Sequence, residues 1–246
     1  MTLGLIGSGM IGGTLARLAV AAGMDVILSN SRGPATLADL VTELGDQARA
    51  ATPVEAARAD LVVATIPLSA YSQLPADALA GKTVIDTMNY YPQRDGTIPE
   101  LDSNELTSSE LVQRHLASSR VVKAFNNITF FNLGNLARPA GADDRSALPI
   151  AGDDTAAKAE LVALLDTLGY DAVDVGTLAD SWRSEPETPV YVQPYMPGRP
   201  PEGLSPEDTF RWMTETPGHP VPAGRIKELT ENVVRGPAGG RFPGSA

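Results

Sequence analysis

The stretch LGLIGSGMIGGTLARLAVAAG, residues 3–23, decides the fold of this 246-residue chain. Residues 2–6 form a short apolar run of the kind found in buried strands, and residues 11–22 have the composition of a helix. Gly23 follows that helix, as a glycine commonly does at a helix end. Three glycines in the pattern G-x-G-x-x-G lie where the strand gives way to the helix. The pattern is informative because a strand precedes it and a helix follows it.

The three glycines have separate physical roles. Gly7 permits a tight turn out of the strand, Gly9 lets a pyrophosphate approach the backbone, and Gly12 lets the helix pack closely. The unbonded N–H groups at the start of the helix then face the anion, and the helix dipole adds about 0.3–1 kcal/mol. We therefore expect a dinucleotide here, rather than a turn that only packs. The predicted contacts are Gly7, Ser8, Gly9, Met10 and Ile11.

The stretch SNSRG, residues 29–33, follows a second expected strand at residues 25–28. An NAD-binding protein usually places Asp or Glu here, on the ribose hydroxyls. This chain instead offers Asn30, Ser31 and Arg32, and an arginine can bind a 2′-phosphate as a fork. Such a charge-assisted bond contributes about 1.5–3 kcal/mol, or roughly a tenfold to hundredfold preference for NADP over NAD. The alternative is a polar loop with a solvated arginine.

The chain then alternates between strand-like and helix-like segments. Such alternation predicts an α/β protein with a Rossmann-type, doubly wound and mostly parallel sheet, which we assign to residues 1–183. The further expected strands are residues 48–51, 60–65, 82–86, 120–123, 147–151 and 172–175, and the further expected helices are residues 34–44, 53–58, 108–117 and 155–168.

The composition changes near Ser184, because 12 of the 20 prolines lie at Pro186 or beyond. A segment so rich in proline cannot easily form its own core. We expect residues 184–235 to be an arm or small subdomain that closes the acceptor site, packed on the sheet or on a partner subunit. Residues 205–214 and 223–234 can form short helices in it, and residues 236–246 are expected to be a disordered tail.

Ligands of such sheets bind at the carboxyl ends of the strands. Asn89 and Asn126 follow two of the expected strands, where they can hydrogen-bond ribose or carboxamide, or can simply form turns. The predicted contacts at these ends are Thr65, Ile66, Pro67, Asn89, Ala124 and Asn126.

Composition excludes several classes of function. The net charge of −11 argues against nucleic acid or an anionic membrane as a partner. The absence of cysteine excludes disulfides and thiolate catalysis, and two histidines distant in sequence argue against a metal site. No signal-peptide pattern and no apolar run of about 18 residues is present, so we expect a cytoplasmic protein with a small-molecule acceptor.

No catalytic residue stands out. Lys123 ends an apolar strand, where it can lie near the site, although pairing with an acid is the favoured interpretation. His115 is expected on an exposed helix face. Tyr90 and Tyr91 come directly after Asn89 in the sequence and can line the pocket. Hydride transfer to a flavin-like acceptor needs no dedicated acid, whereas reduction of a ketone usually does. The lack of an obvious acid therefore favours the flavin-like acceptor.

The segments GLIGSGMIGGTLARLAVAAG, SNSR, VVATIPL, VIDTMNYY and VVKAFNNI resemble the NADP oxidoreductase, coenzyme F420-dependent family, and the cytosolic part of the six-transmembrane ferric reductases, over about residues 1–180. The resemblance implies a homodimeric reductase that binds NADP(H) at the glycine turn. It implies that hydride passes between the nicotinamide and a stacked deazaflavin (F420) or flavin ring. On this basis Ser31 and Arg32 would bind the 2′-phosphate, Thr65, Ile66 and Pro67 would flank the dinucleotide, and Ala124 and Asn126 would border the nicotinamide.

The chain departs from the family pattern mainly on the acceptor side. Its glycine turn reads GSGM instead of GGTG, and Tyr90 replaces the usual proline after Asn89. The proline-rich region from Glu185 differs from the family's short apolar C-terminus. Two alternatives therefore stay open: an NADPH-dependent imine or carbonyl reductase, with an acid near nicotinamide C4, and an NADP(H)-binding sensor without turnover.

Overall fold

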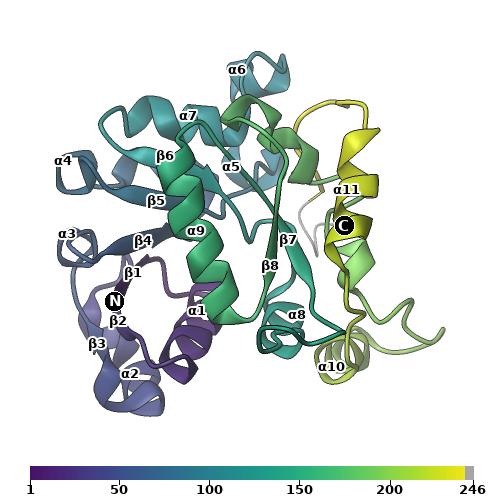
Figure 1. The fold of residues 1–246 in the computed structure, drawn as a ribbon, viewed down its shortest axis with the longest axis horizontal. Helices are drawn as coiled ribbons and strands as arrows, with labels where there is room; N and C mark the ends of the chain where they lie inside the picture. The colour runs from purple at the N-terminus through teal and green to yellow at the C-terminus, as the bar shows by residue number, and fades with distance from the viewer. Residues whose placement is uncertain (242–246) are drawn as a thin grey trace.

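A single twisted sheet of eight strands lies at the centre of the protein, in a computed structural model that describes residues 1–241 (Figure 1). The strand order is β3-β2-β1-β4-β5-β6-β7-β8. Its first six strands are parallel and have the order of dinucleotide-binding sheets. The predicted doubly wound, mostly parallel fold is confirmed. The strands are β1 (Thr2–Ile6), β2 (Asp25–Ser29), β3 (Ala48–Ala50), β4 (Leu61–Ala64), β5 (Thr83–Asp86), β6 (Arg120–Lys123), β7 (Ala147–Gly152) and β8 (Asp171–Asp174).

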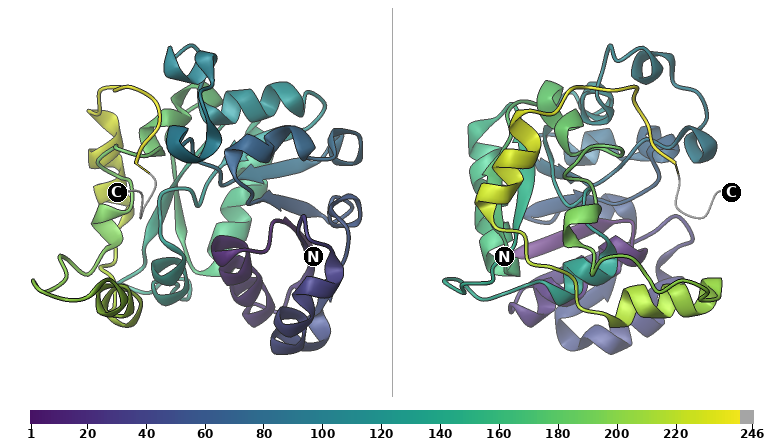
Figure 2. Two further views of the ribbon diagram at one scale, coloured as in Figure 1. Left: turned by 180° about the vertical axis from the view of Figure 1, so that it is seen from behind. Right: turned by 90° about the vertical axis from the view of Figure 1, so that its right-hand side faces the viewer.

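Helices cover both faces of this sheet (Figures 1 and 2). Because both faces are covered, the central strands are apolar throughout: Val63 and Ile85 join one core cluster, Val62 and Val84 the other. Helices α1 (Met10–Ala21), α8 (Phe130–Asn135) and α9 (Thr155–Leu168) pack into the first cluster, and α3 (Pro53–Ala56), α4 (Ala76–Leu79) and α7 (Ser108–His115) into the second. The remaining helices are α2 (Ala38–Leu44), α5 (Pro92–Asp95), α6 (Pro99–Asp102), α10 (Pro206–Glu215) and α11 (Ala223–Glu231).

Local sequence explains where several of these helices begin and end. Thr107 and Glu110 form a reciprocal capping box at the start of α7. The Asp154 side chain accepts a hydrogen bond from the amide of Ala157 at the start of α9, and Gly169 ends that helix in the left-handed conformation. The expected helix at residues 155–168 therefore has the predicted bounds.

Strand β7 runs antiparallel to β6 and departs from the parallel pattern. Only Val122 and Lys123 of β6 pair with it, opposite Gly152 and Ala151. The start of β7 therefore extends beyond the carboxyl end of β6. Strand β8 pairs in parallel with β7, so the two strands form a wall beside the carboxyl edge of the sheet, where ligands of this fold bind.

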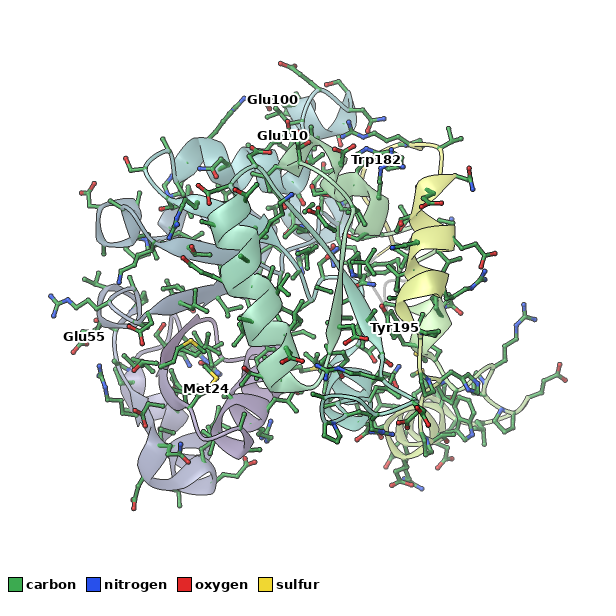
Figure 3. All side chains as sticks on the ribbon, in the orientation of Figure 1. Met24, Glu55, Glu100, Glu110, Trp182 and Tyr195 are labelled. Carbon is green, nitrogen blue, oxygen red and sulfur yellow. The ribbon has the colours of Figure 1, made fainter. Side chains whose placement is uncertain are left out.

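The proline-rich arm packs on this wall within the same chain, which answers the question left open by the sequence. The amide of Ala147 in β7 donates to the carbonyl of Val221 (2.7 Å), and α11 packs against β7 and β8. Val190, Tyr195 and Ile226 are buried, and Tyr195 lies beside β7 in Figure 3. The arm also contains η5 (Gln193–Tyr195), and it follows η4 (Leu178–Ser184).

The expected disordered tail is only partly within the described residues. Gly236 accepts a hydrogen bond from the Asn104 side chain (2.9 Å), and the amide of Gly240 donates to the carbonyl of Tyr90 (3.3 Å). Residues 236–241 thus lie against the domain, because their main-chain groups find partners there although their side chains offer little to bury. Residues 242–246 lie outside the described part of the chain.

Candidate functional site

The glycine turn joins β1, α1 and β4 so closely that side chains are excluded. Gly7 has a φ of 106°, and a Cβ there would lie 2.2 Å from the carbonyl oxygen of Thr65. A Cβ on Gly12 would lie 2.2 Å from the carbonyl oxygen of Gly7. The first glycine is therefore needed for both conformation and space, and the third for the close approach of α1 to the turn.

The second glycine faces open space instead. No atom lies within 4 Å of the position that a Cβ on Gly9 would take. Gly9 is the N-cap of α1, no side chain caps this helix end, and the first turn contains no acidic residue. The first N–H groups of α1 are thus available for an anion, as the pyrophosphate of a dinucleotide requires. Met10 and Ile11 begin the helix, and the Met10 side chain is exposed.

The end of β2 is held against the turn by Ser29. Its carbonyl accepts hydrogen bonds from the amide of Gly7 (2.9 Å) and the hydroxyl of Ser8 (3.0 Å). Its own hydroxyl donates to the carbonyl of Leu5 (2.9 Å). The Ser8 side chain therefore helps to fix the turn beside β2.

The loop after β2 presents one arginine to solvent. Asn30 accepts a hydrogen bond from the amide of Arg32 (3.0 Å) and donates to the hydroxyl of Thr36 (2.9 Å), so its side chain shapes the loop. Ser31 and Arg32 are exposed, and no ion pair of Arg32 occurs within residues 1–241. Arg17, which lies on α1, is instead paired with an acid: its Nε lies 2.5 Å from Glu43 Oε1.

The end of β4 completes the open part of the site. The amide of Thr65 donates to the carbonyl of Ile6 (2.9 Å), which keeps the ends of β1 and β4 in register. Thr65 and Ile66 are half-buried and Pro67 is exposed. The fold therefore brings these three residues to the same edge as the glycine turn.

The two predicted asparagines at the ends of β5 and β6 bind each other. The Asn89 amide nitrogen donates to the carbonyl of Asn126 (2.7 Å), and the Asn126 amide nitrogen donates to Asn89 Oδ1 (3.1 Å). Asn126 also donates to the carbonyl of Ser184 (2.7 Å), whose hydroxyl donates back to Asn126 Oδ1 (3.2 Å). These side chains form a buried link between two strand ends and the arm, and their contact with a cofactor stays a prediction.

Ala124 is also less accessible than a binding residue would be. It is fully buried, and its amide donates to the carbonyl of Asp86 (3.1 Å). The next residue, Phe125, has a φ of 60°, a conformation that is unusual for a bulky side chain. Such strained backbone clusters at functional sites, and here it turns the chain at the end of β6 toward Asn126.

Lys123 is paired with an acid, as the favoured sequence interpretation holds. Its ammonium lies 3.3 Å from Asp86 Oδ2, and both side chains are fully buried. It also donates to the Ser108 hydroxyl (2.9 Å) and to the carbonyl of Met88. Glu185 of the arm accepts from the amide (3.1 Å) and the hydroxyl (2.6 Å) of Ser108, so a buried polar network joins the sheet, α7 and the arm.

Two further sequence expectations are corrected. His115 is half-buried, not exposed: its Nε2 lies 2.9 Å from the carbonyl of Leu74, and its ring meets the edge of Tyr71. Tyr90 packs into the core, and its hydroxyl lies 2.7 Å from Asp102 Oδ1. His115 contacts a segment about 40 positions before it, and Tyr90 contacts Asp102, which follows it by 12 positions, so neither environment can be seen in a linear pattern.

The sequence missed a tyrosine pair. The hydroxyls of Tyr91 and Tyr191 are hydrogen-bonded to each other, although the two residues are 100 positions apart. Tyr91 follows β5, and Tyr191 belongs to the arm. No sequence feature links them, because their meeting depends on how the arm folds back over the strand ends.

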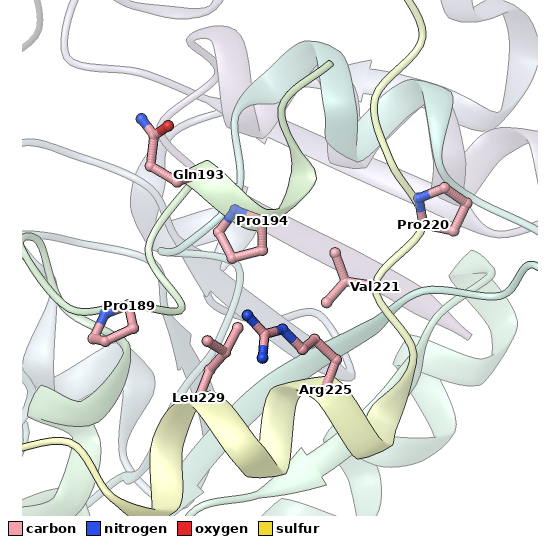
Figure 4. A pocket seen from close by; sticks show the side chains of 7 residues that line it. All are labelled: Pro189, Gln193, Pro194, Pro220, Val221, Arg225 and Leu229. Carbon is pink, nitrogen blue, oxygen red and sulfur yellow. The ribbon is translucent and has the colours of Figure 1, made fainter. Parts of the chain in front are cut away.

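Two cavities lie away from these strand ends. One of about 400 Å³ separates α11 from the η5 region (Figure 4) and is lined by Pro189, Gln193, Pro194, Pro220, Val221, Arg225 and Leu229. The other, of about 260 Å³, lies at the start of β1, β2 and β3. Neither is lined by a predicted site residue. Within residues 1–241 no cluster of three potential metal-ligating side chains occurs, and none of the helices is both long and apolar enough to cross a membrane.

Comparisons with known proteins agree with the architecture. A protein described only as hypothetical protein SMa0349 from Sinorhizobium meliloti is 28% identical, with a TM-score of 0.69 over 78% of this chain and 93% of that one. A "putative f420 dependent nadp-reductase" from Arthrobacter sp. FB24 is 26% identical, with a TM-score of 0.62 over 73% of this chain and 86% of that one. An imine reductase from Myxococcus stipitatus, at 20% identity and a TM-score of 0.50 over 72% of this chain and 55% of that one, shares the fold.

Sequence comparisons match the N-terminal part of the chain. The "Putative protein YjhV" of Escherichia coli K12 is 42% identical over 53 residues, which cover 22% of this chain and 39% of that protein. The chain thus spans well under half the length of this curated relative. Residues 2–90 match the family described as NADP oxidoreductase, coenzyme F420-dependent. The resemblance inferred from the sequence is thereby confirmed over residues 2–90.

Proposed function

We propose that the protein transfers a hydride between NADP(H) and a flavin-like or deazaflavin acceptor such as F420, or a small organic acceptor. The observation that carries this proposal is the uncapped start of α1 beside the open space at Gly9, together with the exposed Arg32. These groups suit a dinucleotide with an additional phosphate. The residues present therefore fit NADP(H).

The chain's own groups divide the binding work between two strands. The first amides of α1 would hold the pyrophosphate, and Ser31 and Arg32 would hold the 2′-phosphate. Thr65, Ile66 and Pro67 would flank the dinucleotide at the end of β4. When bound, NADPH would supply the hydride.

The ends of β5 and β6 would provide the acceptor side. Here the buried Asn89–Asn126–Ser184 link holds the arm against the sheet, so the arm can exclude water from this side of the site. A deazaflavin acceptor is supported by the family of residues 2–90 and by the described activity of the Arthrobacter protein. The family resemblance also leads us to propose a homodimer, which light scattering of the purified protein would test.

A second candidate is an NADPH-dependent carbonyl or imine reductase. It is favoured by the Tyr91 hydroxyl, which is hydrogen-bonded to Tyr191 just beyond the end of β5. Such a group is the kind of acid that these reactions need.

The deciding experiment has two stages. First, calorimetry with NADPH and NADH measures binding, and a lack of heat with both would refute the proposed function. Second, NADPH oxidation is followed with F420, FMN, FAD and a panel of carbonyls and imines. Turnover with F420 alone supports the first candidate, turnover with carbonyls or imines alone supports the second, and binding without any turnover indicates a sensor.

A further inference from the structure

We propose that Tyr91 is the proton donor to the acceptor and that Tyr191 of the arm positions it. The acceptor would then belong to a class that gains a proton on oxygen or nitrogen next to the carbon that gains the hydride, namely a ketone, aldehyde or imine. This inference rests on the second candidate function, hydride transfer from NADPH to a carbonyl or imine.

Tyr91 lies on the acceptor side of the proposed site. It lies two residues after Asn89, just beyond β5. Asn89 is in turn paired with Asn126 beyond β6. Tyr91 thus lies two residues from a side chain that joins both strand ends that would border the nicotinamide.

Neighbouring groups would stabilise the anion that remains after Tyr91 has given up its proton. The Tyr191 hydroxyl is hydrogen-bonded to the Tyr91 hydroxyl, and the Arg94 guanidinium carbon lies 4.9 Å from the centre of the Tyr91 ring. Arg94 is itself held by Asp95 (2.8 Å) and by the carbonyl of Asn89 (2.9 Å). Hydrogen bonds and a nearby cation stabilise a phenolate.

The protonation state at neutral pH is also suitable. Burial raises the pKa of Tyr91, while Tyr191, Arg94 and Asn89 lower it and the carboxylate of Asp95 raises it slightly. The net effect is a raised pKa, so Tyr91 holds its proton until the acceptor develops negative charge. Burial, with Tyr91 nearby, also raises the pKa of Tyr191, and Glu187 adds to this effect.

Backbone hydrogen bonds hold the segment around Tyr191 in place. The backbone amide of Tyr191 donates to the carbonyl of Thr188 (3.0 Å). On either side, Asn127 donates to the carbonyl of Val190 (3.1 Å) and accepts from the amide of Val192 (2.8 Å). The chain beyond β6 therefore fixes the segment that carries Tyr191, and this segment fixes the Tyr91 hydroxyl.

The acceptor carbon gains a hydride with both of its electrons from NADPH, which becomes NADP⁺. The π-electron pair of the C=O or C=N bond moves to the oxygen or nitrogen, which takes the Tyr91 proton. The alcohol or amine leaves, and solvent returns a proton to the Tyr91 phenolate.

The test compares Tyr91→Phe, Tyr191→Phe and the control Tyr90→Phe in the full chain. Tyr90 is a neighbouring buried tyrosine whose hydroxyl lies near Asp102, away from this pair. The probes are cyclohexanone, benzaldehyde and 1-pyrroline with NADPH. For Tyr91→Phe we expect kcat to fall by about 10²-fold or more, with the acceptor KM and the NADPH Kd nearly unchanged.

For Tyr191→Phe we expect kcat to fall on the order of tenfold, again with the NADPH Kd unchanged. Tyr90→Phe should keep its kcat and lose only Tm. An unchanged kcat in Tyr91→Phe would overturn the proposal, as would the absence of turnover of all three probes by the wild-type protein that binds NADPH. A wild-type protein that fails to bind NADPH refutes the proposed function itself, so the two failures are distinguishable.

Discussion

At the ends of β1 and β2 the polar groups face outward, whereas at the ends of β5 and β6 they face one another. The start of α1 has no capping side chain, and Arg32 is exposed. By contrast, Asn89, Asn126 and Lys123 are buried, and each is hydrogen-bonded to other parts of the chain. The same edge of one sheet therefore contains an open half and a closed half.

The difference follows from what each half has to hold. A dinucleotide phosphate brings its own charge, so the protein can leave amides and a guanidinium exposed to water until it binds. A charged side chain in the interior needs a partner within the protein, because an unpaired buried ion costs several kcal/mol of folding free energy. Substitutions in the closed half should therefore reduce stability, and substitutions in the open half should reduce affinity for the coenzyme.

The largest effect is expected at Lys123. Replacing it by Met leaves Asp86 buried without its cation, which should lower the free energy of unfolding by about 3–5 kcal/mol. Denaturant unfolding measures this loss. The control is Lys158→Met, which breaks the more exposed pair with Asp174 and should cost no more than about 1 kcal/mol. Equal losses in the two variants would contradict the closed half as described.

The next effect concerns coenzyme choice. Arg32→Ala should weaken NADPH binding by about tenfold to a hundredfold, because a charge-assisted contact with the 2′-phosphate is lost, and should leave NADH binding nearly unchanged. Calorimetric titration with both coenzymes gives the two dissociation constants. Arg17→Ala, which removes an arginine already paired with Glu43, is the matched control and should affect neither. A parallel loss for NADPH and NADH at Arg32 would refute the phosphate assignment.

Substitutions of two glycines in the same turn, Gly9 and Gly12, should have different effects, one on coenzyme affinity and the other on stability. Gly12→Ala places a Cβ 2.2 Å from a carbonyl oxygen and should cost about 1–3 kcal/mol of stability. Gly9→Ala meets open space and should change stability by less than about 0.5 kcal/mol, yet it should weaken NADPH binding by narrowing the approach to the backbone. Thermal unfolding measures the change in stability, and calorimetry measures the change in NADPH affinity. A Gly9→Ala protein that is destabilised but binds NADPH normally would contradict both expectations for Gly9.

The smallest effect is expected where the arm meets α7. Glu185→Gln keeps an oxygen that can accept from Ser108 but removes the charge, so it should cost about 1 kcal/mol of unfolding free energy. The exposed Glu187→Gln should change stability by less than about 0.5 kcal/mol. If Glu185→Gln were as stable as the wild-type protein, this contact would not hold the arm in place.

Most of the fold could be predicted from local patterns. The apolar run before Gly7, the helix ended by Gly169 and the repeated alternation of strands and helices all have causes within a few residues. The antiparallel direction of β7 could not be predicted, because ALPIA has the same apolar composition as the parallel strands. The exposure predicted for His115 was wrong for a similar reason, since Leu74 and Tyr71 reach it from a different segment.

The sequence by itself determined the glycine turn, the absence of an acid after β2 and the nature of the expected coenzyme, because these depend on residues within one strand-turn-helix unit. The tertiary structure decided what surrounds the ends of β5 and β6. Asn126 meets Ser184 across 58 positions, Ser108 meets Glu185 across 77, and Tyr91 meets Tyr191 across 100. Such contacts form only when the arm folds back on β7 and β8, and no periodicity along the chain encodes them.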